Sequence, residues 1–290
     1  MYTAKIENSR GDKITLTGRE PEYQVLSITG LNPPQGQINT STVSGMDGAL
    51  FNSSKLTTRN IVITIKINGN ADANRLRLYE YFKTKEPCTF YYSHGDLDVF
   101  IDGYVENVEC DLFTIEETAQ ISIICPQPYF RSAEKIETDF QNVVPLFTFP
   151  FSISKNAPVV MSEIEGEDAL NVTNGSPNPT GVTAKINALK SFDTLFIKNV
   201  STNEGITLDY TEFGGFLAGD EIFINTNVGE LTLTLLRAGE FHNLFPALVY
   251  GSEFFQLQPG DNYFAYLIDG IPDTTAITVR FSFFELYRGV

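Results

Sequence analysis

The chain has no tryptophan and is poor in histidine, cysteine and positive charge. Its 290 residues include 2 His and 3 Cys, and 20 Lys or Arg stand against 36 Asp or Glu, for a net charge of −16. A surface of this sign repels nucleic-acid phosphate, so we expect no sequence-specific nucleic-acid binding and no adhesion to an anionic membrane. Runs of about 18 apolar residues are also missing, so the sequence predicts no transmembrane helix.

The residues that usually carry catalysis do not form a recognisable constellation. Cys88, Cys110 and Cys125 are odd in number and widely spaced, which favours packing roles in a reducing compartment over disulfides. His94 and His242 accompany no G-x-S-x-G motif, and glycine-rich phosphate loops and zinc spacings are absent from the sequence. We therefore predict a protein that is not an enzyme and has no cofactor and no resident metal.

Abundant carboxylates leave two weaker alternatives open. The acidic stretches at residues 163–168 and 96–102 could supply oxygen ligands to a structural calcium ion, although neither has the EF-hand pattern and a solvated acidic edge explains them equally. A glycosidase needs only two carboxylates facing one cleft. With 36 acidic residues some pair is always available, so this pattern carries little information.

The side chains that are abundant predict mainly β structure. The sequence holds 23 Phe and 13 Tyr, which fit a pleated, half-buried surface, as do its many Ile, Val and Thr residues. Residues 59–67 alternate, with isoleucine at 61, 63, 65 and 67, which is typical of a half-buried strand. Residues 71–84 form the only convincing helix, with Leu76, Tyr79 and Phe82 on one stripe.

The length of the chain suits two domains. Residues 125–132 (CPQPYFRS) interrupt the strand pattern with two prolines, so we expect domains at 1–131 and 132–290. The first has 12 basic and 16 acidic residues, a balance of −4, and the second has 8 and 20, a balance of −12. The second half is nearly all β, with candidate strands at 157–164, 168–173, 181–189, 194–200, 221–226, 230–237, 253–258, 261–268 and 276–287.

Two polar segments of the first half are distinctive. Ser9-Arg10-Gly11-Asp12 lies between short strands at 2–7 and 13–17 and reads as a hairpin turn, which explains its Arg-Gly-Asp triplet better than integrin recognition. Residues 31–54 are rich in Gly, Pro and Ser and are long for a plain loop. They predict either a flexible loop or an extended arm that packs on another molecule.

An ordered series of motifs in the first half resembles the N-terminal domain of siphophage distal tail proteins. It comprises VLSITGLNPP (25–34), SGMDGALFNSSKLTTRNIVITIKING (44–69), RLRLYEYF (75–82), IDGYVENVE (101–109) and CPQPYF (125–130). The second half is similar to the galectin-like β-sandwich of the same family, through LNVTNGSPNPTGVTAKI (170–186), LFIKNVSTNEGITLD (195–209), AGDEIFINT (218–226) and QLQPGDNYFAY (256–266). The order of the motifs and the sizes of the domains carry the resemblance.

The resemblance implies a structural virion protein at the distal end of the phage tail, made in the host cytoplasm. Such proteins form a hexameric ring, the baseplate hub, that joins the tail tube to the tail-associated hub, lysin or receptor-binding proteins. The implied fold is a β-sandwich or split-barrel-like N-terminal domain with one helix, followed by a galectin-like sandwich. The N-terminal domains would form the ring and a channel through which DNA passes, and the C-terminal domains would lie outside it.

The same resemblance assigns the arm to the interface between subunits. Its candidate interface residues are Asp47, Gly48, Phe51, Ser54 and Arg59, which have the spacing of the family motif. Two alternative functions stay open: a carbohydrate-binding module for host cell-wall glycan, and a wall-degrading hydrolase. Galectins bind sugar partly through a tryptophan, which this sequence lacks, so glycan binding by residues 132–290 does not follow from the resemblance.

Overall fold

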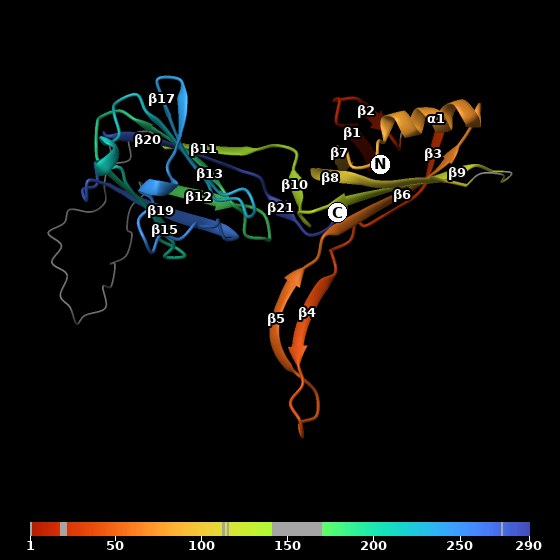
Figure 1. The fold of residues 1–290 in the computed structure, drawn as a ribbon, viewed down its shortest axis with the longest axis horizontal. Helices are drawn as coiled ribbons and strands as arrows, with labels where there is room; N and C mark the ends of the chain where they lie inside the picture. Colours follow the sequence, from red (N-terminus) through yellow and green to blue (C-terminus); the bar gives the residue numbers. More distant parts are fainter. Residues whose placement is uncertain (1, 18–21, 112–113, 115, 141–169, 274) are drawn as a thin grey trace. The chain divides into compact units, whose positions relative to one another are not determined.

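The structure is a computed structural model, and it describes residues 2–17, 22–111, 114, 116–140, 170–273 and 275–290. Within these ranges it is mainly β, with one α-helix, as the sequence predicts. The chain divides into two compact units (Figure 1), a first unit of Met1–Ala133 with Leu286–Val290 and a second unit of Glu134–Glu285. The candidate strand at 157–164 and the acidic stretch at 163–168 lie outside the described residues.

The first unit is built on one antiparallel sheet with the order β2-β1-β7-β8-β9-β6-β3, to which β10 and β21 are added. Its strands are β1 (Tyr2–Asn8), β2 (Lys13–Thr15), β3 (Tyr23–Thr29), β6 (Arg59–Ile67), β7 (Pro87–His94), β8 (Leu97–Cys110), β9 (Thr118–Cys125), β10 (Phe130–Ser132) and β21 (Leu286–Tyr287). A separate hairpin of β4 (Gly36–Ser41) and β5 (Leu50–Leu56) projects from this unit (Figure 1).

Strand β6 shows why this sequence forms a half-buried sheet. Its four isoleucines are 0–4% exposed, while the residues between them are partly or fully exposed. Alternate side chains of a strand point to opposite faces, so the predicted alternation places one complete apolar face in the core. The prediction for residues 59–67 is confirmed, and β6 lies between β3 and β9.

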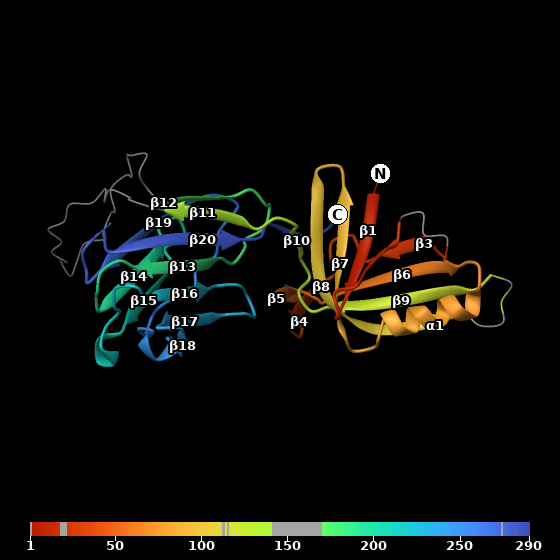
Figure 2. The ribbon, with the colours of Figure 1, turned by 90° about the horizontal axis from the view of Figure 1, so that it is seen from above.

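The sheet bends where β8 changes partner. The first part of β8 pairs with β7 and its last part with β9, and the register shifts between Val105 and Asn107. Figure 2 shows β1 and β7 running across the direction of β6 and β9. At the bend, a Cβ on Gly103 would lie 2.7 Å from a side-chain carbon of Ile123 and 2.9 Å from the Ile124 carbonyl oxygen. Glycine is required there because two strands approach too closely for a side chain.

Helix α1 (Ala71–Tyr81) forms where it is predicted, but of the expected buried stripe only Phe82 is buried. Leu78 is fully buried and Phe82, at the C-cap, is 2% exposed, whereas Leu76 is 60% and Tyr79 39% exposed. The helix therefore buries residues four apart, and the three-residue spacing pointed to a neighbouring face. The first turn is capped by the Asn70 side chain, which accepts a hydrogen bond from the Ala73 amide.

The second unit is a sandwich of a six-stranded sheet, β11-β20-β13-β16-β17-β18, and a four-stranded sheet, β12-β19-β14-β15. One continuous core is formed from the inner faces of both sheets. The strands of this unit are β11 (Ile136–Phe140), β12 (Leu170–Asn174), β13 (Thr183–Ala188), β14 (Thr194–Asn199), β15 (Gly205–Asp209), β16 (Glu221–Asn225), β17 (Thr232–Arg237), β18 (Glu240–Asn243), β19 (Gly260–Ile268) and β20 (Ile277–Phe283). The unit also has two short 3₁₀ helices, η1 (Thr211–Phe213) and η2 (Phe245–Ala247).

Three details of this unit differ from the sequence prediction. Residues 253–258 do not form a strand, although Leu257 makes an isolated bridge to Thr180. Their apolar side chains still enter the core, which is why they resembled a strand: Phe255 and Leu257 are fully buried. Strands β11, β15 and β18 were not predicted, because all three are short and β18 is exposed throughout.

The last residues of the chain return to the first unit. Strand β21 pairs antiparallel with β10, joining Phe130 to Tyr287 and Arg131 to Leu286. The second unit thus lies, along the chain, between two adjacent strands of the first. The sequence-based division at 131/132 falls within β10 and assigns Leu286–Val290 to the second domain, because five residues carry no periodic signal of their own.

Candidate subunit interface

The residues 31–54 singled out by the sequence contribute to a two-stranded hairpin, which we call the arm (Gly36–Leu56). Strands β4 and β5 pair from Gly36–Leu56 to Ser41–Leu50, and the described residues offer the hairpin no third strand. Every residue of β4 is exposed, and β5 is exposed except at its last residue, Leu56. The arm is therefore an ordered element with no core of its own.

The tip of the arm is a tight turn that glycine permits. The Met46 amide donates to the Val43 carbonyl at 3.2 Å. Gly48 has a φ of +88°, a left-handed conformation that side chains rarely adopt. Asp47, just before it, is exposed and makes no hydrogen bond or ion pair within the described part of the chain. The Asp47-Gly48 pair thus has the composition of a turn and presents a carboxylate at the end of the arm.

The two faces of the arm differ in polarity. Directly paired residues share a face, so Ile38 lies beside Ser54, and Phe51 follows on the same face opposite Thr40. Ile38 is 67% and Phe51 66% exposed. The opposite face carries polar pairs, such as the Asn39 amide that donates to the Ser53 hydroxyl at 3.0 Å.

The arm is an amphipathic hairpin whose apolar face has no covering layer within the described ranges. A two-stranded hairpin is marginally stable in water, and stability normally requires a third strand or a packed apolar face. Phe51 and Ile38 have no such cover among the residues that the structure describes. The geometry of the arm is what a surface that packs on another molecule requires.

Arg59, the fifth candidate residue, lies apart from the other four. It is 2% exposed and begins β6, at the base of the arm. Its guanidinium donates to four main-chain carbonyls, those of Gly30, Asn32, Pro128 and Arg288. It also lies 4.5 Å from the ring centroid of Phe130, within the range of a cation–π interaction.

The Arg59 contacts join segments that are far apart in the sequence. Gly30 and Asn32 lead into the arm, Pro128 precedes β10, and Arg288 lies in the C-terminal return. The same seam is closed by the Val290 amide, which donates to the Leu31 carbonyl at 3.1 Å. Burial lowers the pKa of the Arg59 guanidinium, but an arginine remains protonated at any physiological pH. Arg59 is therefore placed to orient the arm from inside the unit, and little of its side chain reaches the surface.

The two histidines considered for catalysis belong to different units. His94 ends β7 in the first unit, and His242 lies on the exposed strand β18 of the second. Burial raises the pKa of the Cys88 and Cys125 thiols to about 12, so both are poor thiolates that pack in the core. In the described ranges, no three His, Cys, Asp or Glu side chains are grouped to hold a metal ion. The described helix is too short to cross a membrane.

Part of the chain is similar to a known protein family. Residues 10–123 match the model of a family described as the phage tail protein RIFT-related domain. Over these residues the chain is similar to a phage tail domain. The matched RIFT-related domain contains the arm, α1 and most of the sheet of the first unit. Curated protein sequences give no match.

Solved structures are similar over the full length of both chains. The crystal structure of SPP1 Dit (gp 19.1), described as a paradigm of hub adsorption apparatus in phages that infect Gram-positive bacteria, has 16% identity and a TM-score of 0.66, with 99% of each chain covered. Chains of the phage P2 baseplate in its activated conformation, with Ca and with Sr, have 13% identity and TM-scores of 0.54 and 0.53, with 100% of each chain covered. The RIFT-related domain and the sandwich that follows it thus share the fold of these chains.

Proposed function

We propose that this chain is a structural virion protein at the distal end of a phage tail, a baseplate hub protein, and not an enzyme. The observation that carries the proposal is the similarity to SPP1 Dit, which covers 99% of both chains and therefore includes both units and their order. The RIFT-related family of residues 10–123 independently supports a place in a phage tail. We place the protein at the tip of the tail in the virion, after synthesis in the host cytoplasm.

The oligomer that we propose is a hexameric ring formed by the first units. The arm supports a contact between subunits, because its apolar face is ordered and uncovered. Asp47, Gly48, Phe51 and Ser54 would lie at the interface, and Arg59 would hold the arm in position from its base.

The partners follow from a hub at the end of a tail. We propose the tail tube protein on one side of the ring and tail-associated hub, lysin or receptor-binding proteins on the other, with the second units outside. Six chains carry a net charge of −96, six times −16. Like charges repel over about 8 Å at physiological salt, so apolar contact and backbone pairing must hold the ring. A wall of this sign would also let DNA pass through the channel without binding.

The proposal is tested by the mass of the assembly in solution. We expect native mass spectrometry of the full chain, alone or with its tail-tube and hub partners, to give a six-fold species. Replacing Val43–Leu50 of the arm tip by a two-residue turn should abolish it, while replacing the exposed two-residue β17–β18 turn, Ala238-Gly239, by Asn-Gly should not. A chain that stays monomeric alone and with both partners contradicts the proposal.

Exposed aromatic rings of the second unit favour glycan recognition as a second candidate function. Phe241 is 70% exposed and Tyr250 is fully exposed. Rings in such positions can stack on sugar faces. Binding of host wall polysaccharide that is lost in Phe241→Ala or Tyr250→Ala would support this function, and no binding across host wall polysaccharides would remove it.

A further inference from the structure

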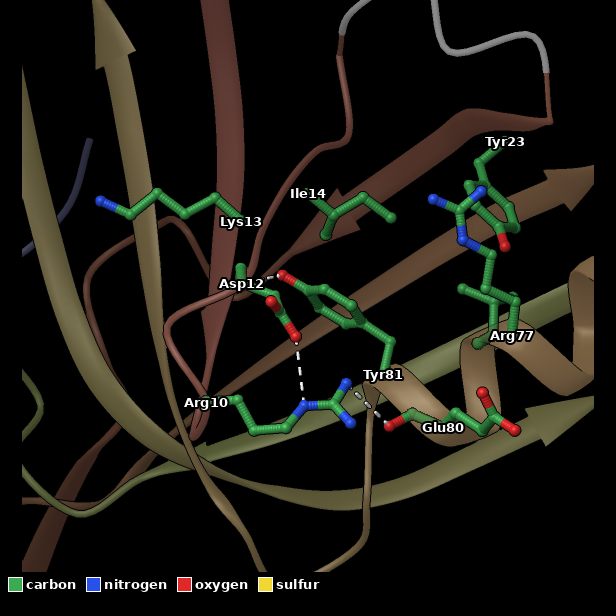
Figure 3. Close-up of a pocket in the computed structure, with 9 residues that line it drawn as sticks. Arg10, Asp12, Lys13, Ile14, Tyr23, Arg77, Glu80 and Tyr81 are labelled. Atoms are coloured by element: carbon green, nitrogen blue, oxygen red, sulfur yellow. Dashed lines mark hydrogen bonds and ion pairs between the residues drawn. The ribbon is translucent and has the colours of Figure 1, made fainter.

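A pocket of about 380 Å³ lies on the first unit between the β1–β2 turn and helix α1 (Figure 3). Arg10, Asp12 and Ile14 line it from the turn side, and Arg77 and Tyr81 line it from the helix. The turn is well fixed, as the sequence predicts, because the Asn8 side chain accepts hydrogen bonds from the amides of residues 10 and 12, both at 3.0 Å. The pocket therefore has a preformed wall.

The hydroxyl of Tyr81 fixes the same wall from the other side. It is within hydrogen-bond distance of the main-chain oxygens of Ile6, at 2.7 Å, and Asp12, at 2.6 Å. Burial raises the pKa of the Tyr81 phenol well above its usual range. The neutral Tyr81 hydroxyl thus connects α1 to the turn. The pocket therefore keeps its shape without a ligand.

Among the charged side chains that line the pocket, Arg77 and Glu80 have no ion pair with a described residue. Arg10 is paired with Asp12 at 3.1 Å and Lys13 with Glu7 at 3.1 Å. Arg77 is exposed and makes no hydrogen bond or ion pair with any residue that the structure describes. A free guanidinium beside an apolar side chain and an aromatic ring suits a ligand with one carboxylate and an apolar flank.

The arm tip has this chemistry. Asp47 is the only charged residue between Thr42 and Leu50, and its neighbours Val43 and Met46 are apolar and 47% and 51% exposed. Resting on the proposed ring, we infer that the arm tip of one copy docks in the pocket of the next copy, with the Asp47 carboxylate on the Arg77 guanidinium. Copies of this acidic chain repel one another overall, so an Asp47–Arg77 ion pair is a local attraction that favours this one contact.

The placement of the two surfaces fits a closed ring. A cyclic assembly of more than two copies needs two different patches on each subunit, so that each copy gives one and receives the other. In Figure 1 the arm leaves the first unit on the side away from α1. A chain therefore does not fill its own pocket, and the next copy can.

The reach of the arm is sufficient. From Gln35 to Met46 the chain can extend roughly 35 Å, at about 3.3 Å per residue. A domain of this size has a diameter of roughly 35–40 Å. The tip can thus cross most of one neighbouring domain before it meets the pocket.

A charge exchange tests the contact in the full chain. Arg77→Glu and Asp47→Arg should each raise the protein concentration at half assembly by on the order of tenfold, because each places like charges together. The double variant should restore assembly, since the attraction is reversed but kept. Lys83→Glu and Asp96→Arg, at exposed positions outside the pocket and the arm, are matched controls that should change assembly little.

A photo-crosslinker tests the place directly. With benzoylphenylalanine at Met46, mass spectrometry should find intermolecular links to residues 10–14 or 77–81. The docking site is wrong if the single charge variants form rings as readily as the wild type and the links map elsewhere. In that case the proposed function still stands, because rings form. A chain that forms neither rings nor intermolecular links at any concentration contradicts both.

Discussion

The second unit and the arm of the first unit are both antiparallel β structure, but they treat their apolar faces in opposite ways. In the second unit two sheets bury their inner faces against each other, and residues such as Leu233 and Phe281 are fully buried. The arm pairs its strands with equal regularity but leaves Ile38 and Phe51 about two thirds exposed. Backbone pairing alone therefore gives the arm a shape, and the burial that would stabilise this shape has to come from another molecule.

The largest expected effect is in the core of the second unit. Phe281 is fully buried, with its ring centroid 4.6 Å from that of Phe264. Phe281→Ala should lower the free energy of unfolding by about 4 kcal/mol, because the removed ring leaves a cavity. Chemical denaturation should measure this loss, and native-state hydrogen exchange should localise it to the second unit. Equal loss of protection in the β6–β9 ladder would show that the two units unfold as one.

The seam at the base of the arm should be next in size. Arg59→Met leaves the carbonyls of Gly30, Asn32, Pro128 and Arg288 without their donor, and each buried unsatisfied carbonyl costs about 1–3 kcal/mol before water relieves it. We expect a loss of about 3 kcal/mol and faster exchange at β10 and β21. Lys83→Met is the exposed control. A neutral Arg59→Met would mean that the four contacts do not hold the seam.

An ion pair of the second unit gives a smaller effect that depends on pH. Burial raises the pKa of Asp220, but hydrogen bonds from Arg237 and from the Leu217 amide, together with the charge of Arg237, outweigh it and lower the pKa. The stability from this pair is therefore present above the ordinary aspartate pKa of about 3.9 and is lost as pH falls through the lower value in the folded state. Asp220→Asn should cost about 2 kcal/mol at pH 7.

The measurement is the unfolding free energy of wild type and Asp220→Asn between pH 7 and pH 2. The difference between the two proteins should shrink below the ordinary aspartate pKa, because the wild type loses a stabilising charge that the variant never has. A difference that stays constant over this range would show that the hydrogen bonds, rather than the charge, carry the effect.

The smallest effect on stability is expected at the arm, where the effect on assembly is large. Phe51→Ala should change the unfolding free energy of the monomer by less than about 0.5 kcal/mol, because the ring is exposed in the single chain. It should nevertheless weaken the oligomer in sedimentation or mass photometry. Leu189→Ala, at an exposed apolar position of the second unit, is the control. A destabilised monomer would indicate that Phe51 packs within its own chain.

Local patterns predicted most of the fold where side chains alternate between core and solvent. The isoleucines of β6 are such a case, and within the predicted strand 230–237 Leu233 and Leu235 of β17 are fully buried. The helix stripe was misplaced because Leu76 and Tyr79 are apolar yet face outward. An apolar side chain is buried only where its face of the helix or strand packs within the same chain. On an interaction surface it stays exposed in the single chain.

The candidate site was predictable in composition but not in geometry. The turn glycine and the exposed Phe51 follow from the motif, whereas the pairing of β4 with β5 depends on backbone hydrogen bonds that a polar sequence does not signal. The role of Arg59 could not be predicted at all, since one of its acceptors, Arg288, is 229 positions away. The free guanidinium of Arg77 lies within an ordinary charged helix face and becomes notable only beside the β1–β2 turn.

The return of β21 to the first unit sets an order of events during synthesis. Domains begin to fold as they leave the ribosome, N-terminal parts first. Residues 286–290 are translated after the whole of the second unit, and they supply the carbonyl of Arg288 to Arg59 and the amide of Val290 to Leu31. The seam under the arm is thus completed only when the second unit has been made. A nascent chain would therefore not join a ring before its first unit is complete.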